Sequence, residues 1–201
     1  MKKWLVAIVL ITVSLNSFSQ EKDKDEENKK SFKENLFTGG SVSLAFYNNT
    51  FLIGVSPVFG YSLTNWADAG VVVNYNYTSY RDYYVLNDKL RQKVYGGGAF
   101  VKLYPVRFLF AQAQVEHNIT HLKYIPVNGG GDIQRSKHDA NSFLVGGGYT
   151  SGREGRGGGP FYYLAVLFDI GNDFFSPYTD ERGRAIPIIR AGLQVPLFQG
   201  R

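Results

Sequence analysis

Three histidines and a neighbouring carboxylate are the residues whose types and spacing first suggest chemistry. Glu116, His117 and His121 lie within six residues, whereas His138 lies apart. A spacing of four places two histidines on one face of a helix, where both can bind one metal ion. On an extended strand the same spacing separates them by roughly 13 Å, which is too far to share an ion. The chain has 201 residues and no cysteine, so thiolate ligands and thiol nucleophiles are excluded.

Five further charges stand singly among small and polar residues. They are Asp68, Lys102, Glu116, Asp169 and Arg190. A buried charge without a partner costs several kcal/mol, so these side chains must pair if the fold turns them inward. Whether they meet depends on the elements that carry them.

Those elements show the period of β-strands. Apolar and polar residues alternate in eight segments of about nine to twelve residues, the length of a tilted transmembrane strand. The segments are 39–47, 50–61, 67–78, 94–104, 107–118, 141–150, 161–170 and 187–198. In the third segment, for example, Val71 and Val73 alternate with Asn74 and Asn76. The pattern predicts an all-β protein with eight antiparallel strands.

The polar face of these segments separates two kinds of barrel. A soluble barrel or sandwich places its apolar residues inside and its charges outside. Here the polar face carries one or two charges per strand among Gly, Ser, Asn and Gln, and the apolar stripes carry none between their ends. The pattern therefore favours a transmembrane β-barrel with lipid outside and a packed polar interior. A soluble eight-stranded barrel is the alternative.

The connections between the segments alternate in length. Short links fall around 63–65 and Pro105, whereas 79–93, 119–140 and 171–186 are long and polar. Outer-membrane barrels alternate in this way between periplasmic turns and external loops, and an even strand count puts both ends on the periplasmic side. Two connections break the rule: the external one at 48–49 is very short, and the turn at 151–159 is long.

The N-terminus predicts export. Residues 1–19 have a basic start, a short apolar run and small residues before a cleavage site between Ser19 and Gln20, which is the layout of a secretory signal peptide. The apolar run is about half the roughly 20 residues that a spanning helix needs. Residues 20–35 are charged and predict a flexible periplasmic segment. The barrel is then expected to comprise 36–201.

The last segment resembles a known signal. Arg190-Ala-Gly-Leu-Gln-Val-Pro-Leu-Phe198 resembles the C-terminal assembly signal of outer-membrane barrels, although Phe198 lies three residues before the end and Pro196 interrupts the strand. With the signal peptide, strand count and loop alternation, the chain resembles the small eight-stranded outer-membrane barrels of Gram-negative bacteria, OmpA-like or OmpW-like in architecture. The resemblance implies integral outer-membrane localisation and insertion by the outer-membrane assembly machinery.

Aromatic residues are expected at both rims of this barrel, as interfacial girdles require. The residues expected near the periplasmic rim are Tyr61, Tyr149, Tyr162 and Phe198, and those near the external rim are Tyr75, Tyr77 and Tyr95.

The expected role is structural or surface-interacting, with no catalytic residue, cofactor or metal. The partners are outer-membrane lipids and lipopolysaccharide, which the basic residues of the long loops would contact; no nucleic acid is expected. One alternative is a small pore or transport barrel for small or hydrophobic solutes. A second is a lipid-modifying enzyme, although no serine follows His117 at short strand spacing. Within the interior we expect Glu116 to pair with Lys102 or with Arg190.

Overall fold

The computed structural model describes residues 32–47, 50–127, 131–156, 158–171, 173–179 and 184–198. The chain divides into two compact units, Met1–Lys33 and Glu34–Arg201, and every strand belongs to the second. The predicted signal peptide, its cleavage site and most of the charged segment lie outside the described residues. Among the described residues, no helix is long and apolar enough to cross a membrane.

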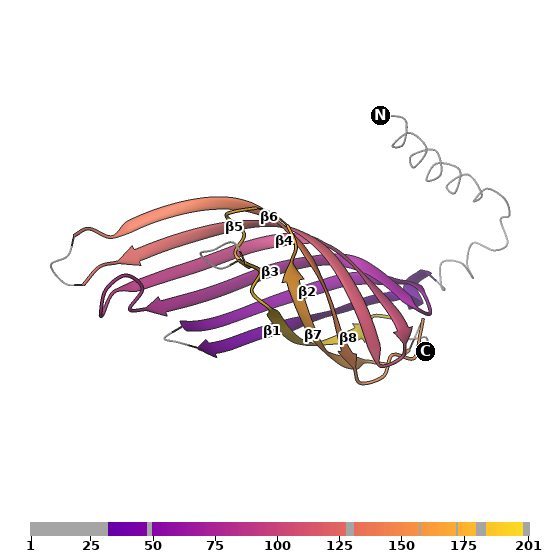
Figure 1. Ribbon diagram of the computed structural model, residues 1–201. Helices are drawn as coiled ribbons and strands as arrows, with labels where there is room; N and C mark the ends of the chain where they lie inside the picture. Colours follow the sequence, from indigo (N-terminus) through magenta and orange to yellow (C-terminus); the bar gives the residue numbers. More distant parts are fainter. Residues whose placement is uncertain are drawn as a thin grey trace, which may run out of the picture. The chain divides into compact units, whose positions relative to one another are not determined.

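Eight antiparallel strands close into a barrel in sequence order, with β1 pairing β8 (Figure 1). The predicted strand number and fold class are therefore confirmed. The strands are β1 (Leu36–Tyr47), β2 (Thr50–Thr64), β3 (Ala67–Arg81), β4 (Lys89–Val106), β5 (Leu109–Ile125), β6 (Gln134–Thr150), β7 (Phe161–Asp169) and β8 (Ile188–Pro196).

The strands are less uniform than the sequence predicts. β2 to β6 have 15 to 18 residues, whereas β7 and β8 have nine each. The predicted loops 79–93 and 119–140 are wrong in their extent, because most of their residues continue β3, β4, β5 and β6. The connections that remain are 82–88 and 126–133. On these strand ends the outer face carries basic residues such as Lys93, and the inner face mixes polar Gln92 with apolar Leu122, so no apolar stripe marks the outer face.

The two ends of the barrel differ in their connections, and we call them the turn end and the loop end. The turn end holds the links 65–66, 107–108 and 151–160 together with the start of β1 and the finish of β8. The loop end holds 48–49, 82–88, 126–133 and 170–187. At the turn end the chain reverses at Arg107 and Phe108, two residues beyond the predicted Pro105, and the Thr150 hydroxyl donates to the Arg107 carbonyl over 2.7 Å.

The outer face of the barrel is largely apolar, and the inner face is polar over most of its length and aromatic near the turn end. β7 alternates strictly between buried and exposed residues, with Tyr162, Leu164 and Val166 exposed. On β3, Val71 and Val73 are exposed, whereas Asn74 and Asn76 are buried. An apolar outer face is the reverse of the charged outer face of a soluble barrel.

Aromatic side chains fill the interior near the turn end. One cluster contains Tyr104, Phe110, Phe161 and Tyr163, and another contains Phe37, Val58, Val72 and Phe100. Inward glycines make room for the rings. A Cβ at Gly60 would lie 2.3 Å from the Phe37 ring, and one at Gly192 would lie 2.6 Å from the Tyr163 ring.

Because β7 and β8 are short, the barrel wall ends earlier on their side than on the side of β3 to β6. β7 pairs β6 only from Leu144 to Thr150, and β8 pairs β1 only from Phe37 to Val42. Between Leu144 and the loop end, β6 pairs with no described strand on this side, and side-chain carboxylates accept hydrogen bonds from some of its backbone N–H groups. The Phe143 N–H donates to Asp169 over 2.9 Å and the Asn141 N–H donates to Asp173 over 2.8 Å.

Candidate functional site: the charged barrel interior

The five charges predicted for the interior all lie there, each with at most 4% of its surface exposed. They do not form one network. Glu116 and Arg190 meet at mid-height, Asp68 lies near the turn end, Asp169 lies at the upper end of β7, and Lys102 sits among aromatic rings.

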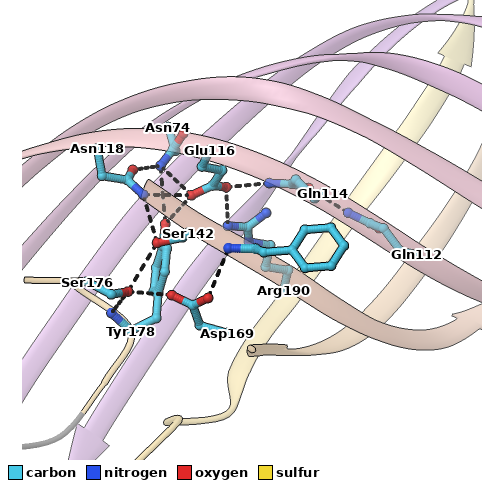
Figure 2. A network of polar contacts seen from close by, with 11 residues as sticks. Asn74, Gln112, Gln114, Glu116, Asn118, Ser142, Asp169, Ser176, Tyr178 and Arg190 are labelled. Atoms are coloured by element: carbon cyan, nitrogen blue, oxygen red, sulfur yellow. Dashed lines mark hydrogen bonds and ion pairs between the residues drawn. The ribbon is translucent and has the colours of Figure 1, made fainter. Parts of the chain in front are cut away.

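Glu116 is the centre of the largest polar cluster (Figure 2). Its Oε1 accepts from Arg190 over 3.1 Å and from the Gln114 amide. Its Oε2 accepts from the hydroxyl of Tyr178 over 2.7 Å and from the amides of Asn74 and Asn118 over 3.2 Å each. Of the two partners expected for Glu116, Arg190 is the one in contact. Both oxygens are occupied, so the carboxylate has no free position for a substrate.

The cluster joins the barrel wall to the segment that follows β7. Tyr178 reaches inward from this segment and also accepts from Asn74 over 3.2 Å. Ser176 lies 3.1 Å from Ser142 of β6 and donates to Asp169. Ser176 and Tyr178 thereby hold the end of the 173–179 segment inside the barrel (Figure 2).

Asp68 pairs with a residue that sequence reasoning missed. Arg153, from the long turn 151–160, enters the barrel and contacts both Asp68 oxygens, the closer at 2.6 Å. Its guanidinium also donates to the carbonyls of Thr64 and Asn65 and lies 4.4 Å from the Tyr104 ring centroid. The unusual length of this turn therefore has a structural use, because it delivers the cation that neutralises Asp68.

Lys102 does not pair with Glu116. Among the described residues it forms no ion pair, and its ammonium lies 4.1 Å from the Tyr163 ring centroid and within 5.4 Å of Phe100 and Phe110. Asp68 is its cross-strand neighbour in register. Ring faces attract cations electrostatically, so the three rings replace part of the lost hydration.

Asp169 acts on the backbone. One oxygen accepts from the N–H groups of Phe143 and Gly171, each over 2.9 Å. It therefore stabilises the point where β7 ends.

Three contacts of these charges could not be predicted from the sequence. Tyr178, Ser176 and Arg153 lie in segments without periodicity, and nothing in their neighbours marks them as inward. One signal was available for Arg153: a buried Asp68 requires a cation, and the turn that is too long for its position contains two arginines, Arg153 and Arg156.

The histidines lie away from the interior charges. His117 and His121 are exposed on the outer face of β5, and His117 Nδ1 lies 3.0 Å from the Asn141 amide oxygen. His138 stacks on Phe175, with ring centroids 4.5 Å apart. Within the described ranges no three His, Asp or Glu residues are grouped to hold a metal ion.

Basic residues form rows on the outer face near the loop end. Strand register places Lys93 beside His121 and His121 beside Lys137, and in the next row Arg91 beside Lys123 and Lys123 beside Arg135. We call these six residues the basic ladder. Within the described part of the chain no carboxylate forms an ion pair with them. Like charges directly opposite each other destabilise a sheet, so the ladder suits an anionic partner.

The predicted girdle residues all lie on the outer face. Tyr95, Tyr149, Tyr162 and Phe198 are exposed, and the others are half-buried. Tyr75 and Tyr95 are paired in register, with ring centroids 5.0 Å apart, one row below the basic ladder.

The connection between β3 and β4 is an ordered loop around Asp88. The Asp88 carboxylate accepts from the backbone N–H groups of Tyr84 over 2.9 Å and of Val85 over 3.1 Å, and from the Tyr124 hydroxyl over 3.0 Å. Burial acts to raise the pKa of Asp88, but these hydrogen bonds outweigh it and hold the pKa below its ordinary value of 3.8. Asp82 and Asn87 adopt left-handed φ values of 56° and 71°.

No protein family matches the sequence. No curated protein matches it either.

Solved structures with a similar arrangement include three small barrels. The Neisserial surface protein A, NspA, has a TM-score of 0.41 at 11% identity, over 81% of this chain and 95% of that one. The Yersinia pestis outer membrane protein Ail has a TM-score of 0.43 at 12% identity, over 80% and 97%. The N-terminal β-barrel domain of Pseudomonas aeruginosa OprF has a TM-score of 0.35 at 16% identity, over 80% and 96%. These likenesses concern the fold alone, which the strand pairing of this chain establishes.

Proposed function

We propose that this chain is an integral outer-membrane barrel with a structural or surface-interacting role. The observation that carries the proposal is the polarity of the barrel: its strands expose apolar side chains outward and bury paired charges inward. Over the height of β7 and β8, where every strand is paired on both sides, an apolar outer surface suits a hydrocarbon environment. The signal-peptide pattern at residues 1–19 supplies the export step.

The orientation follows from the connections. With the turn end in the periplasm, the loop end and its basic ladder face the outside. The ladder then lies one row above the Tyr75–Tyr95 pair, at the depth of lipid headgroups. Its six basic side chains fit phosphate groups, such as those of lipopolysaccharide, through charge-assisted hydrogen bonds.

Membrane integration is tested on the chain expressed in a Gram-negative host. We expect the protein in the outer-membrane fraction, extracted only by detergent, and migrating faster on a gel before heating than after. A soluble periplasmic protein would overturn the proposal.

Headgroup contact is tested with the purified barrel and vesicles that contain an anionic phospholipid. Replacing Lys123 by Gln removes the charge shared by both neighbours in its row, and we expect association to weaken roughly fivefold. Arg107→Gln is the matched control, because Arg107 is exposed at the turn end. Equal effects of the two variants would contradict the assignment of the ladder.

A conducting role is less well supported, because aromatic clusters fill the barrel below the Glu116 cluster. Glu116→Ala is expected to lower stability without producing conductance in planar bilayers. Conductance steps in the wild-type barrel would favour the pore instead.

A further inference from the structure

The interior of the barrel is hollow toward the loop end. An inner cavity of about 120 Å³ is bounded by Leu52, Val94, Tyr178, Ile186, Pro187 and Ile188. A wider cavity of about 430 Å³ lies at the mouth, where Tyr80, Tyr83, His138, Phe174 and Phe175 contribute to its wall. Tyr80, Gln92 and Ile186 border both cavities, so the two cavities lie next to each other.

The inner cavity is mostly apolar with a few polar groups on one wall. Leu52 and Val94 come from the barrel, and the isoleucines come from the stretch that leads into β8. Asn76, Thr78 and Gln92 supply the polar groups. Gln92 accepts from the Tyr80 hydroxyl through Oε1 over 3.4 Å, which leaves its amide N–H groups to donate. One polar group against an apolar wall fixes the orientation of a ligand.

The cavity is closed below. Tyr178 lines it and, through its hydroxyl, binds Glu116 and Asn74, so the hydrogen-bonded cluster forms the floor (Figure 2). Beneath the floor the aromatic clusters fill the barrel. In the described part of the barrel, the Glu116 cluster and these aromatic rings therefore lie between the inner cavity and the turn end.

The mouth is aromatic and exposed. Phe174 has 79% of its surface exposed and packs edge-on against Phe175, with ring centroids 5.4 Å apart. Phe175 in turn stacks on His138. Exposed rings of this kind are costly in water and stack favourably on a second ring.

We propose that the loop half of the barrel binds a small planar ring carrying one hydrogen-bonding group. An apolar cavity of about 150 Å³ in another protein accommodates benzene, so the inner cavity of about 120 Å³ suits a single six-membered ring and nothing wider. The ring packs against Val94, Leu52 and Ile186, and its polar group meets Gln92 or Asn76. This binding site goes beyond the role in the membrane proposed above, and the barrel retains its ligand rather than passing it through.

The test uses the full-length mature chain in lipid nanodiscs with 4-fluorobenzyl alcohol as the probe. Fluorine NMR is expected to show saturable binding that empty nanodiscs lack. Val94→Phe fills the inner cavity and is expected to weaken binding at least tenfold. Val101→Phe is the matched control, because Val101 lies on the same strand with its side chain exposed on the outer face.

A second variant guards against misfolding of the first. Ile186→Phe fills the same cavity from a residue outside the barrel strands, and it is expected to weaken binding as Val94→Phe does. Heat-modifiable migration reports whether each variant has folded. Three results would overturn the proposal: non-saturable uptake equal to that of empty nanodiscs, unchanged binding in a folded cavity-filling variant, or an equal loss in Val101→Phe.

Discussion

The two halves of the barrel interior differ in how they are filled. Near the turn end all eight strands contribute to the wall, and aromatic rings, inward glycines and the Asp68–Arg153 pair occupy the space. Near the loop end β7 and β8 are absent from the wall, and the 173–179 segment enters instead, held by hydrogen bonds around Glu116. Cavities remain around it.

The difference shows what a complete ring of strands contributes. Side chains from eight strands meet in aromatic clusters and leave a cavity of about 20 Å³ at the turn end. A loop that replaces two strands is fixed by a few polar contacts and leaves cavities of about 120 and 430 Å³. The turn half is therefore expected to carry the stability of the fold, and the loop half the capacity to adjust to a ligand. The following predictions test that division.

The largest expected effect is at Asp68. Asp68→Ala leaves Arg153 charged and buried without its partner, so we expect a loss of about 3–5 kcal/mol in the free energy of unfolding. The double variant Asp68→Ala/Arg153→Met removes both charges and is expected to recover part of this loss. Denaturant unfolding in detergent micelles measures both.

The exposed Asp139→Ala on β6 serves as the control for Asp68, with an expected change near zero. If Asp68→Ala is as stable as this control, the turn half does not depend on its ion pair.

A smaller and more local effect is expected at Tyr178. Tyr178→Phe removes one hydrogen bond to the charged Glu116 and one from Asn74, which corresponds to roughly 1.5–3 kcal/mol. Hydrogen exchange is expected to quicken at the amide of Tyr178 while the amides of β4 and β5 near the turn end keep their protection. The exposed Tyr84→Phe is the control. Equal loss of protection in both halves would show that they unfold as one unit.

The smallest effect concerns acid and the 82–88 loop. Because the folded-state pKa of Asp88 is lowered, the charged carboxylate stabilises the loop at pH values above the ordinary 3.8, and this stabilisation is lost as the pH falls through the lowered folded-state value. Exchange at the Tyr84 and Val85 amides should quicken over that acid range. Asp88→Asn should flatten the dependence, whereas Asp132→Asn in the next loop should not.

The sequence predicted the architecture well where the two strand faces differ. Alternation such as Val71 and Val73 against Asn74 and Asn76 placed the outer and inner faces correctly. It failed at Lys89–Lys93 and at 134–140, because the outer face there carries charged residues and no apolar stripe.

The sequence predicted which charged residues lie inside the barrel, but only some of the ion pairs that they form. The alternation along β5 and β8 predicted that Glu116 and Arg190 face inward. It left both Lys102 and Arg190 as possible partners of Glu116. Arg153 and Tyr178 reach the interior from irregular segments, and their position depends on the path of the backbone rather than on any local pattern.

Because β7 and β8 are shorter than β3 to β6, the two sides of the barrel differ in height at the loop end. Residues 134–143 of β6 continue for roughly 30 Å beyond the last residue paired with β7. The rim is therefore oblique, high along β3 to β6 and low at β7 and β8 (Figure 1). In the membrane orientation proposed above, a neighbouring molecule meets the long strands and the basic ladder from one side, and the short strands β7 and β8 from the other. The direction in which the molecule is turned about its own axis then decides what can reach the mouth.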